Sequence, residues 1–324
     1  MKPVSRILLL AVVVLCFQSL SFGWGCSGHQ IVALIAERQL TPAAASAVQA
    51  LLKDTDLYNG LKRYCQATEL GFMASFASWA DDYRNVDKTT GPWHYWDIPL
   101  NASVRPADSA YCDQGCVTKA IQDQIKMLKS DAAKPEKAKA LAFLIHFVGD
   151  MHQPLHVVSN NDRGGNCVPV AFFGRQPVSR DPAGGNYNPN LHGVWDSDLL
   201  EKIGGIRKAT HDDDIVQFVD SIMSDYEEQL PEWSQQGVDV TGWAYESFQH
   251  ARKSTYGNLP HRVSPEAPVS VESCNDDDHV SQRMFALHES INKKYLLGAS
   301  PVIQEQLAKA GTRLAVILNQ TLGI

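Results

Sequence analysis

One stretch, PEKAKALAFLIHFVGDM, constrains the fold of this chain more than any other. It starts at Pro135, and proline is favoured in the first turn of a helix. From Ala140 to Val148 it is apolar almost all round, whereas a helix at a protein surface carries its apolar residues on one side only. The stretch therefore predicts a helix that runs through the middle of the molecule.

Helical periodicity recurs through most of the remaining chain, and long alternating strand patterns do not. Thr41 and Pro42 predict the N-cap and first position of a helix over 41–54. Further helices are expected near residues 71–83, 117–130, 212–228, 243–253, 279–297 and 301–319. The Pro-, Gly- and Asn-dense segment 159–190 predicts a long irregular connection, with at most a short β-hairpin around CVPVAFFG. The fold class is therefore mainly α, a single helical domain with long loops.

The first 23 residues have the layout of a secretory signal peptide. Two basic residues precede an apolar run over 7–17 and a tail with the small residues Ser21 and Gly23 at its end. The run is shorter than the roughly 20 apolar residues of a membrane span. We expect cleavage after Gly23, which gives an exported chain, secreted or periplasmic, that begins at Trp24 and has no membrane anchor.

Residues 24–324 contain no linker, repeat or low-complexity tract, so one large domain is expected. The leader takes two of the 29 basic residues and none of the 36 acidic ones, which leaves 27 against 36 and a net charge of −9 with His neutral. An acidic protein is a poor candidate for binding nucleic acid through a lysine and arginine surface. Positive charge that binds phosphate must therefore be local, or come from metal ions.

Six cysteines follow the expected cleavage point: Cys26, Cys65, Cys112, Cys116, Cys167 and Cys274. An even number in an exported chain favours disulfides over thiolate metal sites. Cys112 and Cys116 are close enough to close a tight loop, and the sequence alone leaves the full pairing open. Asn101 and Asn319 lie in sequons that become glycan acceptors only in a host that glycosylates exported proteins.

The central helix carries a polar pair on one face, because His146 and Asp150 are four residues apart. A lone histidine in an apolar helix is more often a satisfied core residue than a ligand. A carboxylate, however, is very rarely buried without a partner or a metal. The pair therefore indicates a polar site inside the core.

The same spacing recurs in LHGVWD as His192 and Asp196, and the turn that ends the central helix presents His156. Upstream, Asp81 lies in SWADDYR and His94 in WHYWD. Alone, each feature has another interpretation: Asp81 as a solvated helix end, His94 as a packed ring, and the second pair as an exposed helical pair. Jointly they favour zinc, which takes imidazole and carboxylate ligands when cysteines are committed to disulfides.

The candidate ligands are His29, Asp81, His94, His146, Asp150, His156, His192 and Asp196. They are too many for one zinc and too few to close three sites of about three protein ligands each. The free amino nitrogen and the carbonyl oxygen of Trp24 would supply the missing ligands, and they exist as a pair only after the leader is removed. We expect Gly25, Ser27 and Gly28 to let the chain bend back so that His29 reaches the same ion.

Together these motifs resemble the type I nucleases, which are exported zinc-dependent single-strand nucleases and 3′-nucleotidases with the helical fold of the zinc phospholipases C. The matching segments are WGCSGH, SWADDYR, WHYWDIP, HFVGDMHQPLH, GGN, HGVWD, WAYES and PVIQEQLAKAGTRLAVILN. They cover residues 24–324 almost end to end, in the family's order and spacing.

The resemblance implies three zinc ions per chain. One would be held by Asp81, His94, His146 and Asp150, one by His156, His192 and Asp196, and one by Trp24, His29 and Asp150, which then bridges two metals. It implies catalytic roles for Asp81, Arg84 and Asp150. It also implies phosphate contact by Arg84, base contacts by Tyr95 and Asp97, and a substrate contact by Asn166, where the loop after His156 is one residue longer than the fungal pattern.

The implied activity is hydrolysis of single-stranded DNA and RNA to 5′-phosphorylated products, and also of 3′-mononucleotides, by a monomer without a stable protein partner. A single aromatic clamp at Tyr95 needs an unpaired base to stack on. The alternative is a zinc phospholipase C; against it stand Asp196, where those lipases carry glutamate, and the WHYWD base pocket. A zinc-binding protein without enzyme activity is a third hypothesis.

The remaining histidines are expected to play no part in metal binding. His152 should project away from the metal face, at the surface or behind the ligands. The other histidines lack a ligand-like neighbourhood in the sequence. They are His211, His250, His261, His279 and His288.

Overall fold

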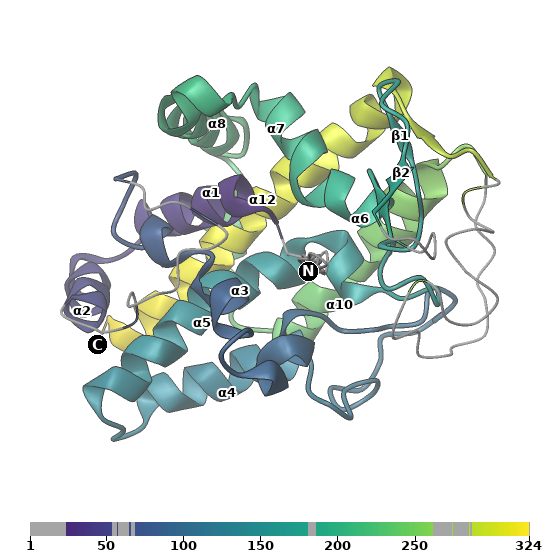
Figure 1. Ribbon diagram of the computed structural model, residues 1–324. Coiled ribbons are helices and arrows are strands. Elements are labelled where there is room, and N and C mark those ends of the chain that lie inside the picture. The colour runs from purple at the N-terminus through teal and green to yellow at the C-terminus, as the bar shows by residue number, and fades with distance from the viewer. Residues whose placement is uncertain are drawn as a thin grey trace, which may run out of the picture.

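The computed structural model describes residues 24–53, 57, 65, 69–180, 186–261, 274, 285 and 287–323. The expected signal peptide and His279 lie outside these residues. Within them the fold is mainly α with very short strands, as the sequence predicts. Long helices surround a central helix, and the strands gather at one end (Figure 1).

The centre of the molecule is α5 (Lys134–His152), the stretch that the sequence singles out. All of its residues from Ala140 to His152 are buried. The long helix α12 (Lys293–Leu322) packs against α5 and α1 (Cys26–Glu37), and α4 (Val117–Lys129) covers another side of α5 (Figure 1). The prediction of a central, buried helix from its apolar sequence is therefore confirmed.

The other α-helices lie around this core. They are α2 (Pro42–Leu52), α3 (Trp79–Tyr83), α6 (Leu191–Gly193), α7 (Leu199–Gly204), α8 (His211–Asp225), α9 (Leu230–Gln235) and α10 (Val240–His250). Short 3₁₀ turns are η2 (Ala74–Phe76), η3 (Lys88–His94), η4 (Pro154–Val157), η6 (Lys208–Thr210) and η8 (Tyr256–Asn258), and π turns are η5 (Val194–Asp198) and η7 (Ala251–Thr255). The predicted cap of α2 is confirmed, because the Thr41 hydroxyl accepts the Ala44 N–H at 3.2 Å.

Several expected helices have different boundaries. The described part of the helix expected over 279–297 contains strand β4 (Ser290–Ile291) and becomes helical only at Lys293, in α12. The helix expected over 71–83 is split into η2 and α3, and the break leaves the carbonyl of Ala77 free to accept a side-chain donor. The break expected at Pro301 is absent, since α12 continues through it. Proline removes one helical bond to the residue four positions earlier, and here that residue is Leu297, which is 65% exposed and open to water.

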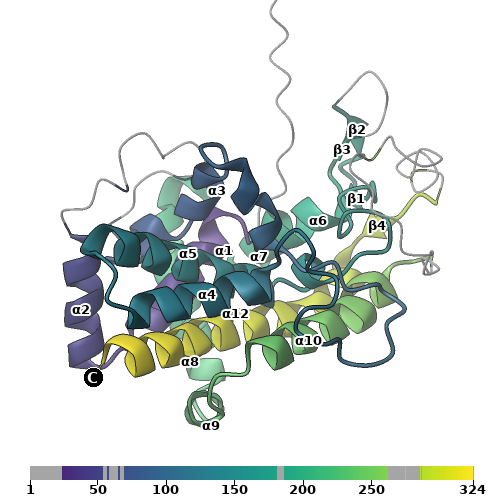
Figure 2. The same ribbon diagram turned by 90° about the horizontal axis from the view of Figure 1, so that it is seen from below.

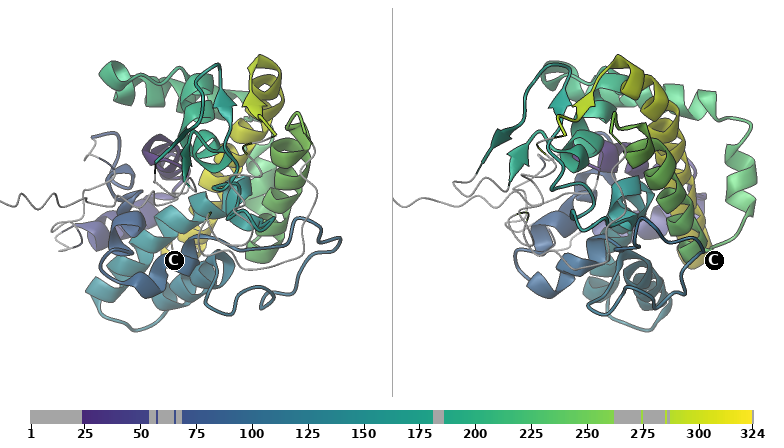
Figure 3. Two further views of the ribbon diagram at one scale, coloured as in Figure 1. Left: turned by 45° about the vertical axis from the view of Figure 1, so that its right-hand side comes forward. Right: turned by 90° about the vertical axis from the view of Figure 1, so that its right-hand side faces the viewer.

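The hairpin expected around CVPVAFFG is reduced to a tight turn, in which Phe172 and Arg175 form an isolated antiparallel bridge with both backbone bonds at 2.9 Å. Strand β1 (Ala171–Phe172) from that segment pairs in parallel with β4 (Ser290–Ile291), which leads directly into α12 (Figure 3). The antiparallel pair is instead β2 (Val178–Ser179) with β3 (Tyr187–Asn188). Both small sheets lie together at one end of the helical body (Figure 2). Local sequence indicates that a segment is extended, but it does not show with which distant segment it pairs.

Three disulfides join Cys26 to Cys65, Cys112 to Cys116, and Cys167 to Cys274. The tight Cys112–Cys116 loop is the one that sequence spacing suggests. The other two close loops of 39 and 107 residues, which only the fold could reveal. Disulfides of this kind fit an oxidising, extracytoplasmic compartment. Among the described helices, none is long and apolar enough to cross a bilayer.

Candidate metal centre and active site

The eight candidate side-chain ligands come together around the carboxyl-terminal half of α5, and each is at most 5% exposed. They arrive from separate elements. Asp81 is on α3, which is anchored to α5 where Trp79 and Tyr83 meet the Phe143 ring at centroid distances of 5.0 and 5.6 Å. His94 ends the 3₁₀ turn η3, and α1 supplies His29.

Four of the ligands form a first cluster at the centre. His94 Nδ1 lies 3.1 Å from His146 Nε2 and 2.9 Å from Asp150 Oδ2. Asp81 Oδ1 lies 3.8 Å from His94 Nδ1 and 3.7 Å from His146 Nε2. The structure thus brings together the four residues that the resemblance assigns to one zinc ion.

A second cluster is formed by His156, His192 and Asp196. The Nε2 atoms of the two histidines are 3.0 Å apart, and Asp196 Oδ2 lies 3.4 Å from His192 Nε2. The Asn190 side chain caps the turn of His192 by accepting the Gly193 N–H at 2.9 Å, and Asp196 follows in the π turn η5. Such π turns are frequent at functional sites.

His29 lies at the edge of the first cluster, within reach of Asp81 and His146 as well as of Asp150. Its Nε2 lies 3.4 Å from Asp150 Oδ1, and its ring stacks on His146 with centroids 3.9 Å apart. The other oxygen of Asp150 faces the first cluster, so the two carboxylate oxygens serve different groups of ligands. Trp24 is fully buried, and the next residue, Gly25, donates its N–H to the Asp196 carbonyl at 2.8 Å. The amino-terminal end of the described chain is therefore fixed at the second cluster.

The small residues near the amino terminus act by close approach and not by bending. Helix α1 already starts at Cys26, and Gly25 is its N-cap with φ −51°. A Cβ on Gly25 would lie 2.3 Å from Ser197 Oγ, and one on Gly28 would lie 2.5 Å from Trp24 Cβ. The two glycines therefore position His29 by allowing close approach of neighbouring atoms, and the expected bend of the chain is not needed.

The orientation of three imidazoles is fixed by backbone carbonyls. His146 Nδ1–H donates to Ala77, His156 Nδ1–H to His94, and His192 Nδ1–H to Gly164, each at 2.7 Å. Each bond accounts for a proton on Nδ1 and turns Nε2 toward its cluster, where the neutral ring can bind a metal ion.

Several polar atoms of the clusters are buried without a hydrogen bond among the described residues. They are both ring nitrogens of His29, His94 Nε2, Asp81 Oδ1 and Asp150 Oδ1. A buried polar atom without a partner is costly. Three of these atoms, His29 Nε2, Asp81 Oδ1 and Asp150 Oδ1, face other ligands, and converging imidazole and carboxylate lone pairs are what a cation such as zinc requires, so the residues present fit metal ions.

The electrostatics of the centre also call for positive charge. Burial alone would lower the pKa of His146, but the carboxylates of Asp150 and Asp81 outweigh it and raise that pKa to about 9. Burial raises the pKa of Asp196 well above its ordinary value, and the neighbouring carboxylates of Asp150 and Asp81 add to the effect. Cations would compensate this buried negative charge.

The expected substrate residues lie beside the clusters. Arg84 Nη2 is 3.6 Å from Asp81 Oδ1, with only 11% of its side chain exposed. The ring of Tyr95 is 40% exposed. The Trp96 N–H donates to the His156 carbonyl at 2.7 Å, so the segment of Tyr95 and Asp97 runs along the second cluster.

Asp97 has an unusual environment. Although it is exposed by area, protein atoms crowd its carboxyl group; this desolvation first, and then the Asp162 carboxylate, raise its pKa to about 6 against the opposing effect of Arg163. Burial and then Asp97 raise the pKa of Tyr95 as well. Both residues therefore remain protonated to a higher pH than usual.

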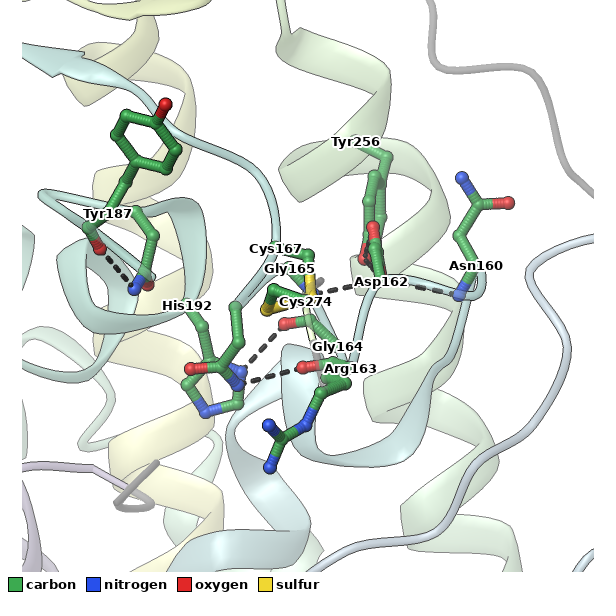
Figure 4. Close-up of a disulfide and its surroundings, with 12 residues drawn as sticks. Asn160, Asp162, Arg163, Gly164, Gly165, Cys167, Tyr187, His192, Tyr256 and Cys274 are labelled. Atoms are coloured by element: carbon green, nitrogen blue, oxygen red, sulfur yellow. Dashed lines mark hydrogen bonds between the residues drawn. A yellow bond between two sulfur atoms is a disulfide. The ribbon is translucent and has the colours of Figure 1, made fainter. Parts of the chain in front are cut away.

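The GGN motif shapes the loop that holds His192. Arg163, Gly164 and Gly165 all have left-handed φ values, of 56°, 58° and 85°, and a Cβ on Gly164 would lie 2.4 Å from the Leu155 carbonyl. Asn166 donates its side-chain amide to the Arg163 carbonyl at 2.8 Å, which closes the loop. Figure 4 shows Gly164 facing His192 beside the Cys167–Cys274 disulfide.

Of the histidines excluded as ligands, one agrees with expectation and one does not. His152 points away from the ligands, and of the two expected places, at the surface or behind the ligands, it takes the buried one: Nδ1–H donates to Val148, and Nε2 accepts from Arg313 at 2.9 Å. Burial, then Arg313, lowers its pKa to about 3. His250 does have a ligand-like neighbourhood, with Glu246 and Glu305, which the sequence analysis missed because Glu305 comes from α12.

Sequence reasoning also missed Gln153. It is fully buried between the clusters and donates its side-chain amide to Asp196 Oδ1 at 2.5 Å. Its place three residues after Asp150 and three residues before His156 was the available signal.

The fold and the site define a helical protein with a buried centre suited to metal ions. The family model S1/P1 Nuclease matches residues 24–323, and the chain therefore belongs to the S1/P1 nuclease family. It is 27% identical to Nuclease S1 of Aspergillus oryzae over 97% of this chain and 97% of that protein. It is 29% identical to Endonuclease 4 of Arabidopsis thaliana over 92% of this chain and 88% of that protein. It is also 33% identical to Nuclease P1 of Penicillium citrinum, over 56% of this chain and 60% of that protein. The chain is thus a nuclease, a hydrolase of nucleic-acid phosphodiester bonds.

Proposed function

We propose that residues 24–324 form an exported, zinc-dependent nuclease domain that hydrolyses single-stranded DNA and RNA to 5′-phosphorylated products, and that it also acts on 3′-mononucleotides. Residues 1–23 would be the signal peptide, and the mature protein would be a secreted or periplasmic monomer. Three zinc ions per chain would be held by the groups named above, with Trp24 as amino-terminal ligand.

The observation that carries the proposal is the position of Asp150. One oxygen lies 2.9 Å from His94 Nδ1 and the other 3.4 Å from His29 Nε2. A carboxylate whose two oxygens face imidazole nitrogens of different ligands suits a bridge between two cations. His156, His192 and Asp196 suit a third ion.

Bound zinc ions would supply Lewis-acid chemistry, because they lower the pKa of water and polarise a phosphate oxygen. The protein's own residues orient the substrate. Arg84 would bind the phosphate through its guanidinium group, and Asp81, 3.6 Å from Nη2, holds that group in place. Cleavage of the bond between phosphorus and the 3′ oxygen would leave the phosphate on the 5′ side.

Tyr95 and Asp97 would select the base. An exposed ring offers a face for stacking, and stacking on one ring requires an unpaired base. The Asp97 carboxylate would accept hydrogen bonds from base N–H groups. This arrangement favours single strands and 3′-mononucleotides over duplex, and it needs no extended basic surface on an acidic protein.

The alternative activity, a zinc phospholipase C, can be tested on the same preparation. We expect cleavage of single-stranded DNA, RNA and 3′-AMP, little cleavage of duplex DNA, and none of phosphatidylcholine vesicles. Release of phosphocholine without cleavage of DNA would overturn the proposal. Zinc-loaded protein that cleaves none of these substrates would support the non-enzyme hypothesis.

The maturation step has its own test. Secreted protein should begin at Trp24 and hold three zinc ions, by amino-terminal sequencing and elemental analysis. A variant with one extra residue before Trp24 should lose one zinc, because the amino group and carbonyl of Trp24 can no longer chelate together. Three zincs in the extended variant would rule out Trp24 as a ligand.

A further inference from the structure

Gln153 is a fully buried glutamine at the end of α5. It is the C-cap residue of that helix, and its backbone N–H donates to the Asp150 carbonyl at 3.0 Å. The sequence around it places Asp150 three residues before and His156 three residues after. Its side chain therefore starts from a backbone position between a ligand of the first cluster and a ligand of the second.

The carbonyl oxygen of the Gln153 side chain caps the next turn. Oε1 accepts the Leu155 N–H at 2.6 Å at the start of η4, the turn that presents His156. Pro154 has no N–H, so Leu155 carries the first backbone donor of that turn. Donors in the first turn of a helix need a partner from outside it.

That bond determines which way the amide group faces. Because Oε1 accepts from Leu155, the NH₂ group points to Asp196 and donates to Oδ1 at 2.5 Å. The other carboxylate oxygen, Oδ2, is then the one directed at His192 Nε2, 3.4 Å away. One donated bond thus orients the carboxylate, with Oδ2 toward His192 and Oδ1 at 4.0 Å from His156 Nε2.

The backbone of Asp196 is held independently by the Gly25 N–H at 2.8 Å. Main chain and side chain of this ligand are therefore each restrained by one hydrogen bond. His192 is oriented by Gly164, and His156 by the His94 carbonyl, both at 2.7 Å. Gln153 is the residue that contacts two of these parts at once, the turn of His156 and the carboxylate of Asp196.

We infer that Gln153 is a positioning residue that sets the spacing between His156 and Asp196 and so holds the second cluster in a geometry ready for its metal ion. The inference rests on the proposed zinc centre. Met has the length of Gln but neither hydrogen-bonding group, and Asn has both groups but is one methylene too short to reach both partners. Removal of a partner of this kind typically weakens metal affinity or activity about 10- to 100-fold.

The test compares Gln153→Met with wild type and with Gln306→Met. Gln306 is equally buried and also makes two side-chain hydrogen bonds, to the His152 carbonyl at 3.0 Å and to Ser247 at 2.7 Å, but these reach no metal ligand. Zinc-loaded proteins would be mixed with the chelator 4-(2-pyridylazo)resorcinol, and zinc release would be followed with time. Thermal unfolding of the zinc-free proteins would report stability separately.

We expect one of the zinc ions of Gln153→Met to be released roughly 10- to 100-fold more readily than in wild type, with the rest retained. Gln306→Met should lose thermal stability but keep its zinc. In activity assays kcat should fall in Gln153→Met more than KM rises, since the site is misassembled but the base pocket is intact. If Gln153→Met does not fold, Gln153→Asn should show the same selective loss.

Two outcomes would overturn the inference: wild-type zinc retention in both Gln153 variants, or equal zinc loss in the Gln153 and Gln306 variants. Failure of the proposed function looks different. Zinc-loaded wild type would then leave nucleic acids intact, while selective zinc loss from Gln153→Met would still support the positioning role.

Discussion

Asp150 Oδ1 lies 3.4 Å from His29 Nε2, both side chains are fully buried, and neither atom makes a hydrogen bond within the described residues. Two acceptors at this distance in a dry core are unfavourable unless a proton or a cation lies between them. The point where helix α1 meets helix α5 therefore suits a bound cation.

Asp150→Asn should lose metal and activity together, because one amide oxygen cannot serve both groups of ligands. We expect loss of at least one zinc by elemental analysis and a fall in kcat/KM on single-stranded DNA of about 100-fold or more, as for loss of a metal-site residue. Asp123→Asn, in an exposed pair on α4, is the control and should change neither. Three retained zincs with full activity in Asp150→Asn would remove the bridging role.

Tyr95→Ala should weaken binding of single-stranded substrate without loss of zinc. Stacking of a base on an aromatic ring is worth about 1–3 kcal/mol, so KM on short oligonucleotides should rise roughly 5- to 150-fold. Tyr111→Ala removes another exposed ring, 51% exposed, and serves as the control. An unchanged KM in Tyr95→Ala would exclude the ring as the stacking surface.

The raised pKa of Asp97 predicts a pH dependence of base binding. Above about pH 6 the carboxylate is ionised and accepts base N–H groups; below it the carboxyl is protonated and loses that capacity. Affinity for 5′-GMP, measured by calorimetry between pH 5 and 7.5, should therefore fall as the pH drops through about 6. The step should vanish in Asp97→Asn, and its persistence there would assign it to another group.

Glu246 predicts a pH dependence of stability. Burial would raise its pKa, but Arg313 and Lys309 outweigh it and lower the pKa to about 2. A lowered folded-state pKa gives stability that is present above the unfolded value and is lost as the pH falls through the folded one. The melting temperature should thus drop between about pH 4.5 and 2, and Glu246→Gln should lower it at pH 7 and flatten this part of the profile. Glu227→Gln, at the surface, should leave the profile unchanged.

Much of the fold follows from local sequence. The apolar run of α5 has no polar face to offer water, so it can only be a central helix. Thr41 and Pro42 start α2 for reasons that lie within four residues of chain. The course of α12 through Pro301 does not follow from local sequence, since it depends on what surrounds the helix.

The pairing of distant segments could not be predicted from the sequence for the same reason. Strand β1 pairs with β4, and Cys167 with Cys274, across more than 100 residues of chain. Hydrophobic periodicity reports which side of an element is buried but not against which element. His250 has Glu246 within reach along its own helix, but Glu305 comes from α12, whose side chains meet those of α10 at Gln306–Ser247 and Arg313–Glu246.

The candidate site divides in the same way. The four-residue spacing of His146 and Asp150, fixed by the helical repeat, determined from the sequence alone that both face one side of a buried helix. Only the tertiary structure decided which atoms meet: that the two oxygens of Asp150 face different groups of ligands, and that Gln153 reaches across to Asp196. Periodicity acts between neighbours in the chain, whereas ligand geometry depends on contacts between α1, α3, α5 and η5, which exist only once the core has packed.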